Sequence, residues 1–195
     1  NHWAIGGIGL WWPGRCDKER PLNEEEGKYL EHEWANGGCM LWTSFNELSN
    51  SSTRCEAGGA RMAIQGDGPV HSGIDNLATV NMGNNITDHQ RKRKEVRLMN
   101  EEGARIIGGM TSHLHRKSLS KRPWELTKNG DLWQSIEEAV EAKGPRSVKL
   151  TKVKGHATNE MVEEGTVKEK DKEGNDASDK ACLLYTSDAA DEVDS

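Results

Sequence analysis

Residues 148–181 read VKLTKVKGHATNEMVEEGTVKEKDKEGNDASDKA, and the pattern of side chains changes twice along this stretch. Residues 147–153 alternate apolar and polar side chains, which predicts a β-strand. The alternation ends before His156, and a long polar segment follows. We interpret that segment as a flexible loop leading to Asn175, where we expect a helix that carries Asp179 to begin. The stretch therefore places a histidine at the end of a strand and a carboxylate on the next element.

The preceding sequence predicts a mixed α/β domain. We expect strands at residues 4–12, 38–45, 69–74 and 147–153, and a helix at residues 54–64. Residues 51–53 offer N-caps for that helix, and Asp131 caps a second helix that ends at Gly144. The charged residues 17–34 form a hairpin-like excursion between the first two strands. Strands that alternate with helices are typical of an α/β fold.

Length and composition limit the class of protein. The chain has 195 residues, of which 33% are apolar and 30% are charged, so we expect one domain with a modest core. It contains neither a run of about 18 apolar residues nor a recognisable signal peptide, so we expect an intracellular protein that is not secreted and does not enter a membrane. The four cysteines lack metal-binding or disulfide spacing, which indicates a reducing compartment.

The two ends of the chain differ from its middle. Residues 182–192 read CLLYTSDAADE, which resembles a translated sequencing adaptor, so we treat residues 182–195 as a non-native tail and residues 1–181 as the domain. The tail carries four acids and no base, so the formal charge of −6 becomes −2 without it. The chain also begins without a methionine, and we expect it to be a fragment truncated at both ends.

Basic residues are concentrated in residues 88–124, which hold ten Lys or Arg against four Asp or Glu. The run RKRKEVR contains Arg91, Lys92, Arg93 and Lys94. A solvated surface accounts for such a run, but clustered cations also bind phosphates. Both interpretations stay open from composition alone.

Three acids fall at positions where an α/β fold brings ligands together. Asp75 directly follows a strand, at the edge where such sheets bind ligands, and Glu56 lies in the preceding helix. Asp179 lies in the last helix. Each acid alone fits a capping or solvated role, whereas converging carboxylates are ligands that Mg²⁺ prefers.

Five segments of the chain carry a set of motifs, namely NSSTRCEAGG (residues 50–59), SGIDN (72–76), KNGDLWQSI (128–136), KVKGHAT (152–158) and GNDASDKA (174–181). In the family's own order, these segments resemble the ribonuclease H family of the type 1 class, particularly the domains attached to retroelement reverse transcriptases. KVKGHAT matches a Val-Lys-Gly-His-Ala motif, and GNDASDKA resembles a closing Gly-Asn-x-x-Ala-Asp pattern. Each match is weak singly, and their common order makes the resemblance specific.

The resemblance implies a five-stranded mixed sheet flanked by helices. It also implies endonucleolytic hydrolysis of the RNA strand of an RNA/DNA hybrid with two Mg²⁺ or Mn²⁺ ions. Glu56, Asp75 and Asp179 would be the catalytic metal ligands, and His156 a catalytic proton carrier. Contacts to the hybrid would come from Ser51, Ser52, Asn76, Asn175, Arg91, Lys92, Arg93 and Lys94. A reverse transcriptase domain in the same polyprotein is the expected partner.

One part of the family pattern has no counterpart in the chain, namely the Asp-Gly-Ser motif of the first strand, which supplies a metal-bridging carboxylate. Because that strand is central in the family's sheet, we expect its two neighbours to lack their shared partner and the chain alone to be inactive. Two alternatives stay open. One is a module that binds hybrids or duplexes without cleaving them, and the other is an integrase-like or resolvase-like enzyme of the same fold.

Overall fold

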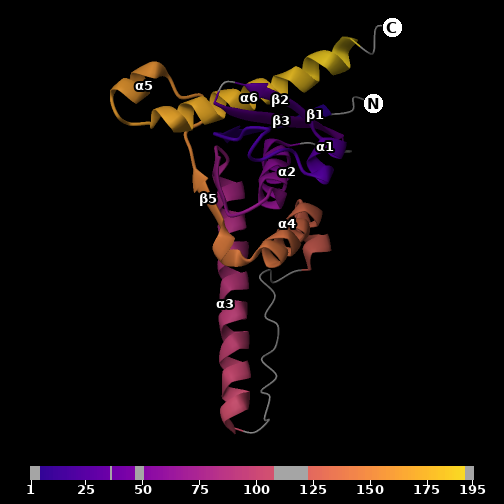
Figure 1. Cartoon of the computed structure of the whole chain (residues 1–195), viewed down its shortest axis with the longest axis vertical. Helices are drawn as coiled ribbons and strands as arrows, with labels where there is room; N and C mark the ends of the chain where they lie inside the picture. The colour runs from indigo at the N-terminus through magenta and orange to yellow at the C-terminus, as the bar shows by residue number, and fades with distance from the viewer. Residues whose placement is uncertain (1–4, 36, 47–50, 108–122, 192–195) are drawn as a thin grey trace.

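The chain forms a mixed α/β structure, as the sequence predicts (Figure 1). A computed structural model describes residues 5–35, 37–46, 51–107 and 123–191. The strands are β1 (Ile5–Pro13), β2 (Glu31–Ala35), β3 (Gly38–Asn46), β4 (Val70–Ile74) and β5 (Val148–Lys152). The helices are α1 (Glu24–Tyr29), α2 (Ser52–Gln65), α3 (Leu77–Ile107), α4 (Gly130–Lys143), α5 (Asn159–Glu163) and α6 (Glu169–Asp191), with 3-10 turns η1 (Trp124–Leu126) and η2 (Pro145–Ser147). Within these ranges, no helix is both long and apolar enough to cross a membrane.

The strands form two separate sheets. β1, β3 and β2 make an antiparallel sheet in which β3 is central, and Ile5 to Pro13 pair along their whole length with β3. β4 and β5 make a parallel pair, in register from Val70 opposite Val148 to Ile74 opposite Lys152. The described residues therefore contain five strands, but not the continuous five-stranded sheet that the resemblance implies. β1 and β4 each keep one edge to which no described strand is paired.

The main hydrophobic core lies between α2, α3, α4 and the β4–β5 pair. Its buried members are Ala57, Ala60, Ile64, Ile74, Val80, Ile86, Leu132, Trp133, Ile136, Val140, Val148 and Leu150. The apolar residues of α4 recur at three- and four-residue spacing, so they share one helix face and pack together. The side chain of Ser51 caps α2 by accepting a hydrogen bond from the Arg54 amide at 3.3 Å.

Asp131 does not cap α4, which corrects the expectation from the sequence. Asn129 occupies the N-cap position in the left-handed conformation, with φ at 58°, and its side chain makes no capping hydrogen bond. Asp131 instead lies in the first turn, where both of its oxygens accept hydrogen bonds from the Arg54 guanidinium, at 2.9 and 2.5 Å. This ion pair joins the start of α2 to the start of α4.

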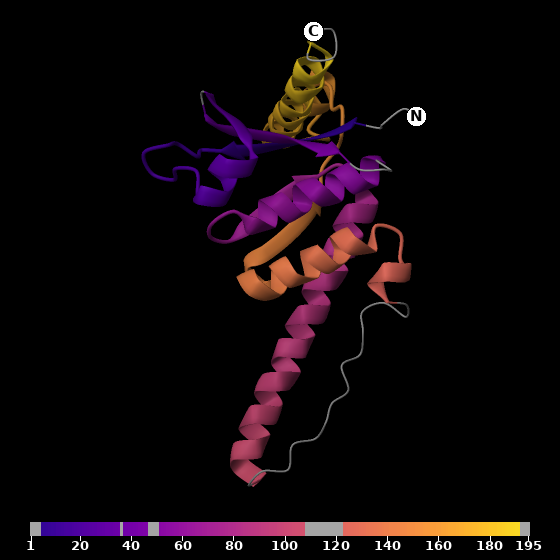
Figure 2. The same cartoon turned by 90° about the vertical axis from the view of Figure 1, so that its right-hand side faces the viewer.

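α3 is a 31-residue helix that projects well beyond the rest of the molecule (Figures 1 and 2). Val80 and Ile86 in its first half are buried in the core, whereas Leu98 and Met99 in its second half are 55% and 71% exposed. The basic run at residues 91–94 lies between these two parts of the helix, where Arg93 is still 3.7 Å from Glu137 of α4. The rest of the basic segment, residues 108–122, lies outside the described residues.

The polar segment after β5 is largely helical, which corrects its interpretation as one long loop. α5 follows β5 closely, and α6 begins at Glu169. Asn175 therefore lies in the second turn of α6 and does not start the helix. α6 also continues to Asp191, through most of the tail that resembles an adaptor. A Cβ atom on Gly7 would lie 2.8 Å from the carbonyl oxygen of Cys182, so α6 packs closely against β1 at this position.

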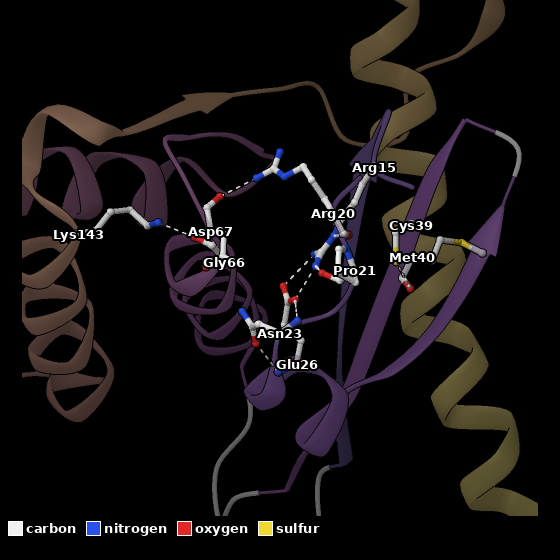
Figure 3. A network of polar contacts seen from close by, with 10 residues as sticks. All are labelled: Arg15, Arg20, Pro21, Asn23, Glu26, Cys39, Met40, Gly66, Asp67 and Lys143. Atoms are coloured by element: carbon white, nitrogen blue, oxygen red, sulfur yellow. Dashed lines mark hydrogen bonds and ion pairs between the residues drawn. The ribbon is translucent and has the colours of Figure 1, made fainter. Parts of the chain in front are cut away.

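The charged excursion after β1 forms α1 and β2, and a buried ion pair holds it in place. Arg15 donates two hydrogen bonds to Glu26, at 2.8 and 2.6 Å, and others to the carbonyl oxygens of Arg20 and Pro21 (Figure 3). The two side chains are only 6% and 10% exposed. Asn23 and Glu26 also form a reciprocal capping box at the start of α1.

A second set of contacts ties this excursion to the other sheet. Arg20 donates to the carbonyl oxygen of Asp67 at 2.7 Å, in the turn between α2 and β4. Lys143, at the end of α4, donates to the carbonyl oxygen of Gly66 at 2.5 Å (Figure 3). It also donates to the carbonyl oxygen of Gly68 at 2.7 Å. Three segments that are far apart in sequence therefore meet at one corner of the molecule.

Candidate functional site

A cavity of about 420 Å³ lies between the two sheets. Residues 7–13 of β1 form one wall, and residues 69–75, which include all of β4, form another. Residues of α2 and α6, together with Thr151 and Val153, line the remaining sides. The cavity also contains three of the acids that the sequence singles out, Glu56, Asp75 and Asp179.

The three acids come from separate elements and lie close enough to affect one another. Glu56 is on α2, Asp75 directly follows β4, and Asp179 is on α6. The pKa of Glu56 is raised to about 7, chiefly by burial and further by the charge and hydrogen bond of Asp75 and the charge of Asp179, while Lys152 opposes the rise. Such repulsion is expected where carboxylates share one partly buried space.

Asp179 is also held where its negative charge is unfavourable. Burial raises its pKa, the His156 side chain opposes this, and the charges of Asp75 and Asp176 raise the pKa further. Asn175, one turn earlier on α6, donates a hydrogen bond to Asp179 Oδ2 at 3.0 Å. Asn175 therefore orients the carboxylate, and it lines the same cavity.

His156 lies beside this acid but outside the cavity. Its Nδ1 is 3.7 Å from Asp179 Oδ2, and its side chain is 88% exposed. Its backbone has φ at 51°, a left-handed conformation that is uncommon for residues other than glycine. The preceding Gly155 lies directly against Asp75, because a Cβ atom there would be 2.5 Å from Asp75 Oδ2. The turn therefore brings the histidine and two of the acids together.

Three of the residues expected to contact nucleic acid, Ser51, Ser52 and Asn76, do not line the cavity, and two of them have structural roles. Ser51 caps α2, and Ser52 is exposed in its first turn. Asn76 accepts a hydrogen bond from the Thr79 amide at 3.0 Å and donates one to Thr53 Oγ1 at 3.3 Å. Asn76 therefore joins the start of α3 to the start of α2.

The basic run is divided between ion-paired and solvent-facing side chains. Arg91 is paired with Asp88 at 2.8 Å, and Arg93 lies 3.7 Å from Glu137. Lys92 and Lys94 are exposed on α3. The expected phosphate contacts therefore fall on a projecting helix and not inside the cavity.

The described residues do not form a metal site as they stand. Carboxylate oxygens are the donors that Mg²⁺ prefers, so the chemistry of the three acids suits a divalent cation. Their arrangement does not, because in the described part of the chain no group of three or more His, Cys, Asp or Glu side chains could hold an ion.

Sequence reasoning missed three residues that belong to the site. Lys152, at the end of β5, lowers the pKa of Glu56, and its position within KVKGHAT was a usable signal. Cys55 and Cys182 line the cavity, and burial raises the pKa of both thiols. Cys182 was missed because the tail was set aside.

Comparison with known proteins gives no match: no family model, curated protein or solved structure is significantly similar to this chain.

Proposed function

We propose that this chain is the larger part of a ribonuclease H-like domain whose complete form hydrolyses the RNA strand of RNA/DNA hybrids with Mg²⁺ or Mn²⁺. The observation that carries the proposal is the convergence of Glu56, Asp75 and Asp179, from three separate elements, on one cavity in which the pKa of Glu56 rises to about 7. Acids that serve only as solvated surface groups do not need to converge on one partly buried cavity.

The arrangement of strands supports the same fold. An antiparallel sheet ending in β1 and a parallel pair ending in β4 face each other across the cavity, and Asp75 directly follows β4. One added strand between β1 and β4 would give a mixed sheet with the acids at its edge. The fold proposal therefore needs one strand that the described residues do not supply.

The chain's own residues have distinct roles in this proposal. Glu56, Asp75 and Asp179 concentrate negative charge, and a divalent cation, when bound, would neutralise it and activate water. Because the described carboxylates do not hold an ion by themselves, we propose that at least one further oxygen ligand completes the site. His156, on an exposed turn beside Asp179, is placed to exchange protons with solvent.

The basic face of α3 would bind the hybrid through its phosphates. Lys92 and Lys94 are exposed there, and phosphate contacts position a duplex without reading its sequence. Cleavage is therefore expected to show little sequence preference.

The test is a cleavage assay with the RNA strand of a hybrid labelled at one end. The 195-residue chain and a version cloned with its upstream reading frame are compared with Mg²⁺, Mn²⁺ or a chelator. We expect only the longer protein to cleave, and only with a metal. Asp75→Asn is expected to abolish cleavage, whereas Glu173→Gln, which changes an exposed acid on α6, leaves it intact. Retained cleavage in Asp75→Asn would overturn the metal-site assignment.

A second candidate function is a module that binds hybrids or duplexes without cleaving them. The specific observation in its favour is that the described acids do not form a metal site. Binding that persists in the longer protein without cleavage in either metal would favour this candidate.

A further inference from the structure

A second cavity, of about 520 Å³, lies between α3 and the 3-10 turn η1, and we call it the α3–η1 groove. It is lined by Met82, Asn85, Asp88, His89, Lys92, Trp124 and Thr127. Positions 82, 85, 89 and 92 recur at three- and four-residue spacing, so they share one face of α3. None of the seven residues lines the cavity that holds the three acids. The groove is therefore a separate site on the same chain.

Trp124 is held in this groove by hydrogen bonds and by packing. Its Nε1 donates to Glu137 Oε2 at 2.9 Å, and Gln90 donates to Glu137 Oε1 at 3.0 Å. A Cβ atom on Gly130 would clash with the carbonyl oxygen of Trp124, so η1 lies tightly against the start of α4. Trp124 and Met82 also pack against the main hydrophobic core. The half-buried indole is therefore fixed in position before any ligand arrives.

The lining residues suit a flat ring with polar edges. An indole surface in a groove can stack on a nucleobase, and such stacking tolerates every base because each has a π face. The thioether of Met82 also packs favourably against aromatic rings. Asn85 and Thr127 supply an amide and a hydroxyl group, which donate and accept hydrogen bonds. The volume of the groove lies in the range of about 300–1,000 Å³ that is typical of small-molecule sites, so one nucleotide fits.

The charges of the groove favour a phosphate beside Lys92. Lys92 is exposed, and Asp88 is the only acid among the seven lining residues. The carboxylate of Asp88 is already paired with Arg91 at 2.8 Å. A lysine ammonium group forms charge-assisted hydrogen bonds with phosphate oxygens. The groove therefore combines an aromatic surface with a cation at its rim.

We propose that the α3–η1 groove binds one unpaired nucleotide, with its base stacked on Trp124 and its phosphate at Lys92. Two sources carry this chemistry, namely a free nucleotide and a nucleotide in a single-stranded segment of DNA or RNA. A base inside a duplex does not fit, because its faces are covered by its neighbours. The proposal does not rest on nuclease activity, so it and the cleavage assay can fail separately.

Titration of the 195-residue chain with AMP tests the proposal. The indole N–H resonance of Trp124 is followed by NMR and assigned from a Trp124→Phe variant. AMP is expected to shift it saturably, and adenosine, which lacks the phosphate, is expected to bind at least threefold more weakly. Ribose 5-phosphate lacks the base and is expected to bind more weakly still. Absence of a saturable shift with millimolar AMP, or equal binding of AMP and ribose 5-phosphate, would overturn the proposal.

A charge variant tests the position of the phosphate. Lys92→Gln is expected to remove the advantage of AMP over adenosine, so that the two ligands bind equally. Lys94→Gln is the matched control, because Lys94 is an exposed residue of α3 that does not line the groove, and the ratio should stay unchanged. An equal loss in both variants would indicate general attraction by the basic helix and would contradict a phosphate at Lys92.

Two further variants test the position of the base. Trp124→Leu removes the stacking surface and is expected to weaken AMP binding at least fivefold, as the change in amide resonances of the groove reports. Because Trp124 packs on the core, circular dichroism checks the fold. Asn85→Trp fills the groove from an exposed position and is expected to abolish the shift, whereas Ala78→Trp, two turns earlier on α3, leaves it intact. A shift that persists in Asn85→Trp would overturn the location.

Labelled hybrids separate the two sources of the nucleotide. One hybrid is blunt and the other carries a short single-stranded end, and fluorescence anisotropy measures their binding to the chain. At least fivefold tighter binding of the second hybrid would assign the groove to single-stranded segments, and AMP should then compete this preference away. Equal binding of the two hybrids would assign it to free nucleotides. A preference that AMP does not reduce would overturn the groove as the site.

Discussion

Protonation of Glu56, in the cavity, makes the stability of the protein depend on pH. Its pKa is raised from an ordinary value of 4.5 to about 7, chiefly by burial and then by Asp75 and Asp179. The folded protein therefore binds this proton more tightly than the unfolded chain does. The resulting stability is fully present below about pH 4.5 and is lost as the pH rises through about 7.

Our first prediction is that Glu56→Gln removes this pH dependence of stability. At pH 8 the variant is expected to be more stable than the parent chain by on the order of 2 kcal/mol, because it no longer buries a charge. Near pH 4 the two should agree. Urea unfolding at both pH values gives the comparison. Glu173→Gln is the matched control, and an equal difference at both pH values would contradict the prediction.

Glu26 responds to pH in the opposite direction. Burial alone would raise its pKa, but the hydrogen bond from Arg15 and other favourable contacts outweigh burial and hold the pKa below its usual range. The stability that this carboxylate contributes is therefore present above its ordinary pKa and is lost as the pH falls through the lowered pKa.

Our second prediction concerns this buried pair. Glu26→Gln leaves the Arg15 guanidinium buried beside a neutral amide, so we expect a loss of about 3 kcal/mol in the free energy of unfolding at pH 7. The double variant Arg15→Met/Glu26→Leu buries no charge and is expected to recover part of that loss. Thermal or urea unfolding measures both, and a double variant less stable than Glu26→Gln would show that the hydrogen bonds to Arg20 and Pro21 dominate.

At the scale of single elements, α3 carries the cations that are expected to meet nucleic acid. Our third prediction is that Lys92→Gln/Lys94→Gln weakens hybrid binding and reduces the slope of log K against log salt concentration by about 2 at most. Each lost phosphate contact removes about 0.9 from the magnitude of that slope. Arg91→Gln/Arg93→Gln should have the smaller effect, because both arginines already face acids. Filter binding across a salt series measures the slopes. Equal slopes in all three proteins would indicate a solvated face.

The strands could be predicted from the sequence because a strand that is buried on one face alternates apolar and polar side chains. Each of the four expected strands lies within one residue of its observed bounds, and α2 and α4 also occur where apolar spacing places them. β2 was missed because its side chains are mostly exposed and it pairs only at an edge. The start of α6 was missed because Glu169 begins a polar turn without apolar periodicity, so nothing marked it as helix before Asn175.

The three acids of the site were predictable from the sequence, but the geometry of the site was not. Motif order selected Glu56, Asp75 and Asp179, and these three do meet at one cavity. The contact of Gly155 with Asp75, and the exposed left-handed His156, depend on how the turn after β5 lies against β4. Such contacts between distant segments leave no local pattern in the sequence.

At the scale of the whole molecule, the last helix, α6, contacts both sheets. α6 lies against β1, where Cys182 contacts Gly7, and it also lines the cavity beside β4. Residues past Ala181 therefore take part in packing, although their sequence resembles an adaptor. Their contribution to stability is measurable whatever their origin.

Our fourth prediction follows from that contact. A chain that ends at Ala181 loses Cys182 and the end of α6, so we expect it to be less stable by about 1–2 kcal/mol, or about 2–8 °C in Tm. A chain that ends at Leu184 keeps Cys182 and should stay closer to the parent. Calorimetry of the three lengths provides the test. Equal Tm values for all three would indicate that the tail is not needed for packing.

The path along α3 from the acids to the exposed lysines sets a minimum size for a duplex that contacts both. Leu77 begins the helix two residues after Asp75, and Lys94 lies seventeen residues further along it. At about 1.5 Å per residue these positions are about 25 Å apart along the axis. A duplex that rises about 3.4 Å per base pair must therefore be about eight pairs long to touch both. Shorter duplexes would reach either the acids or the lysines, so affinity should rise in a step with duplex length.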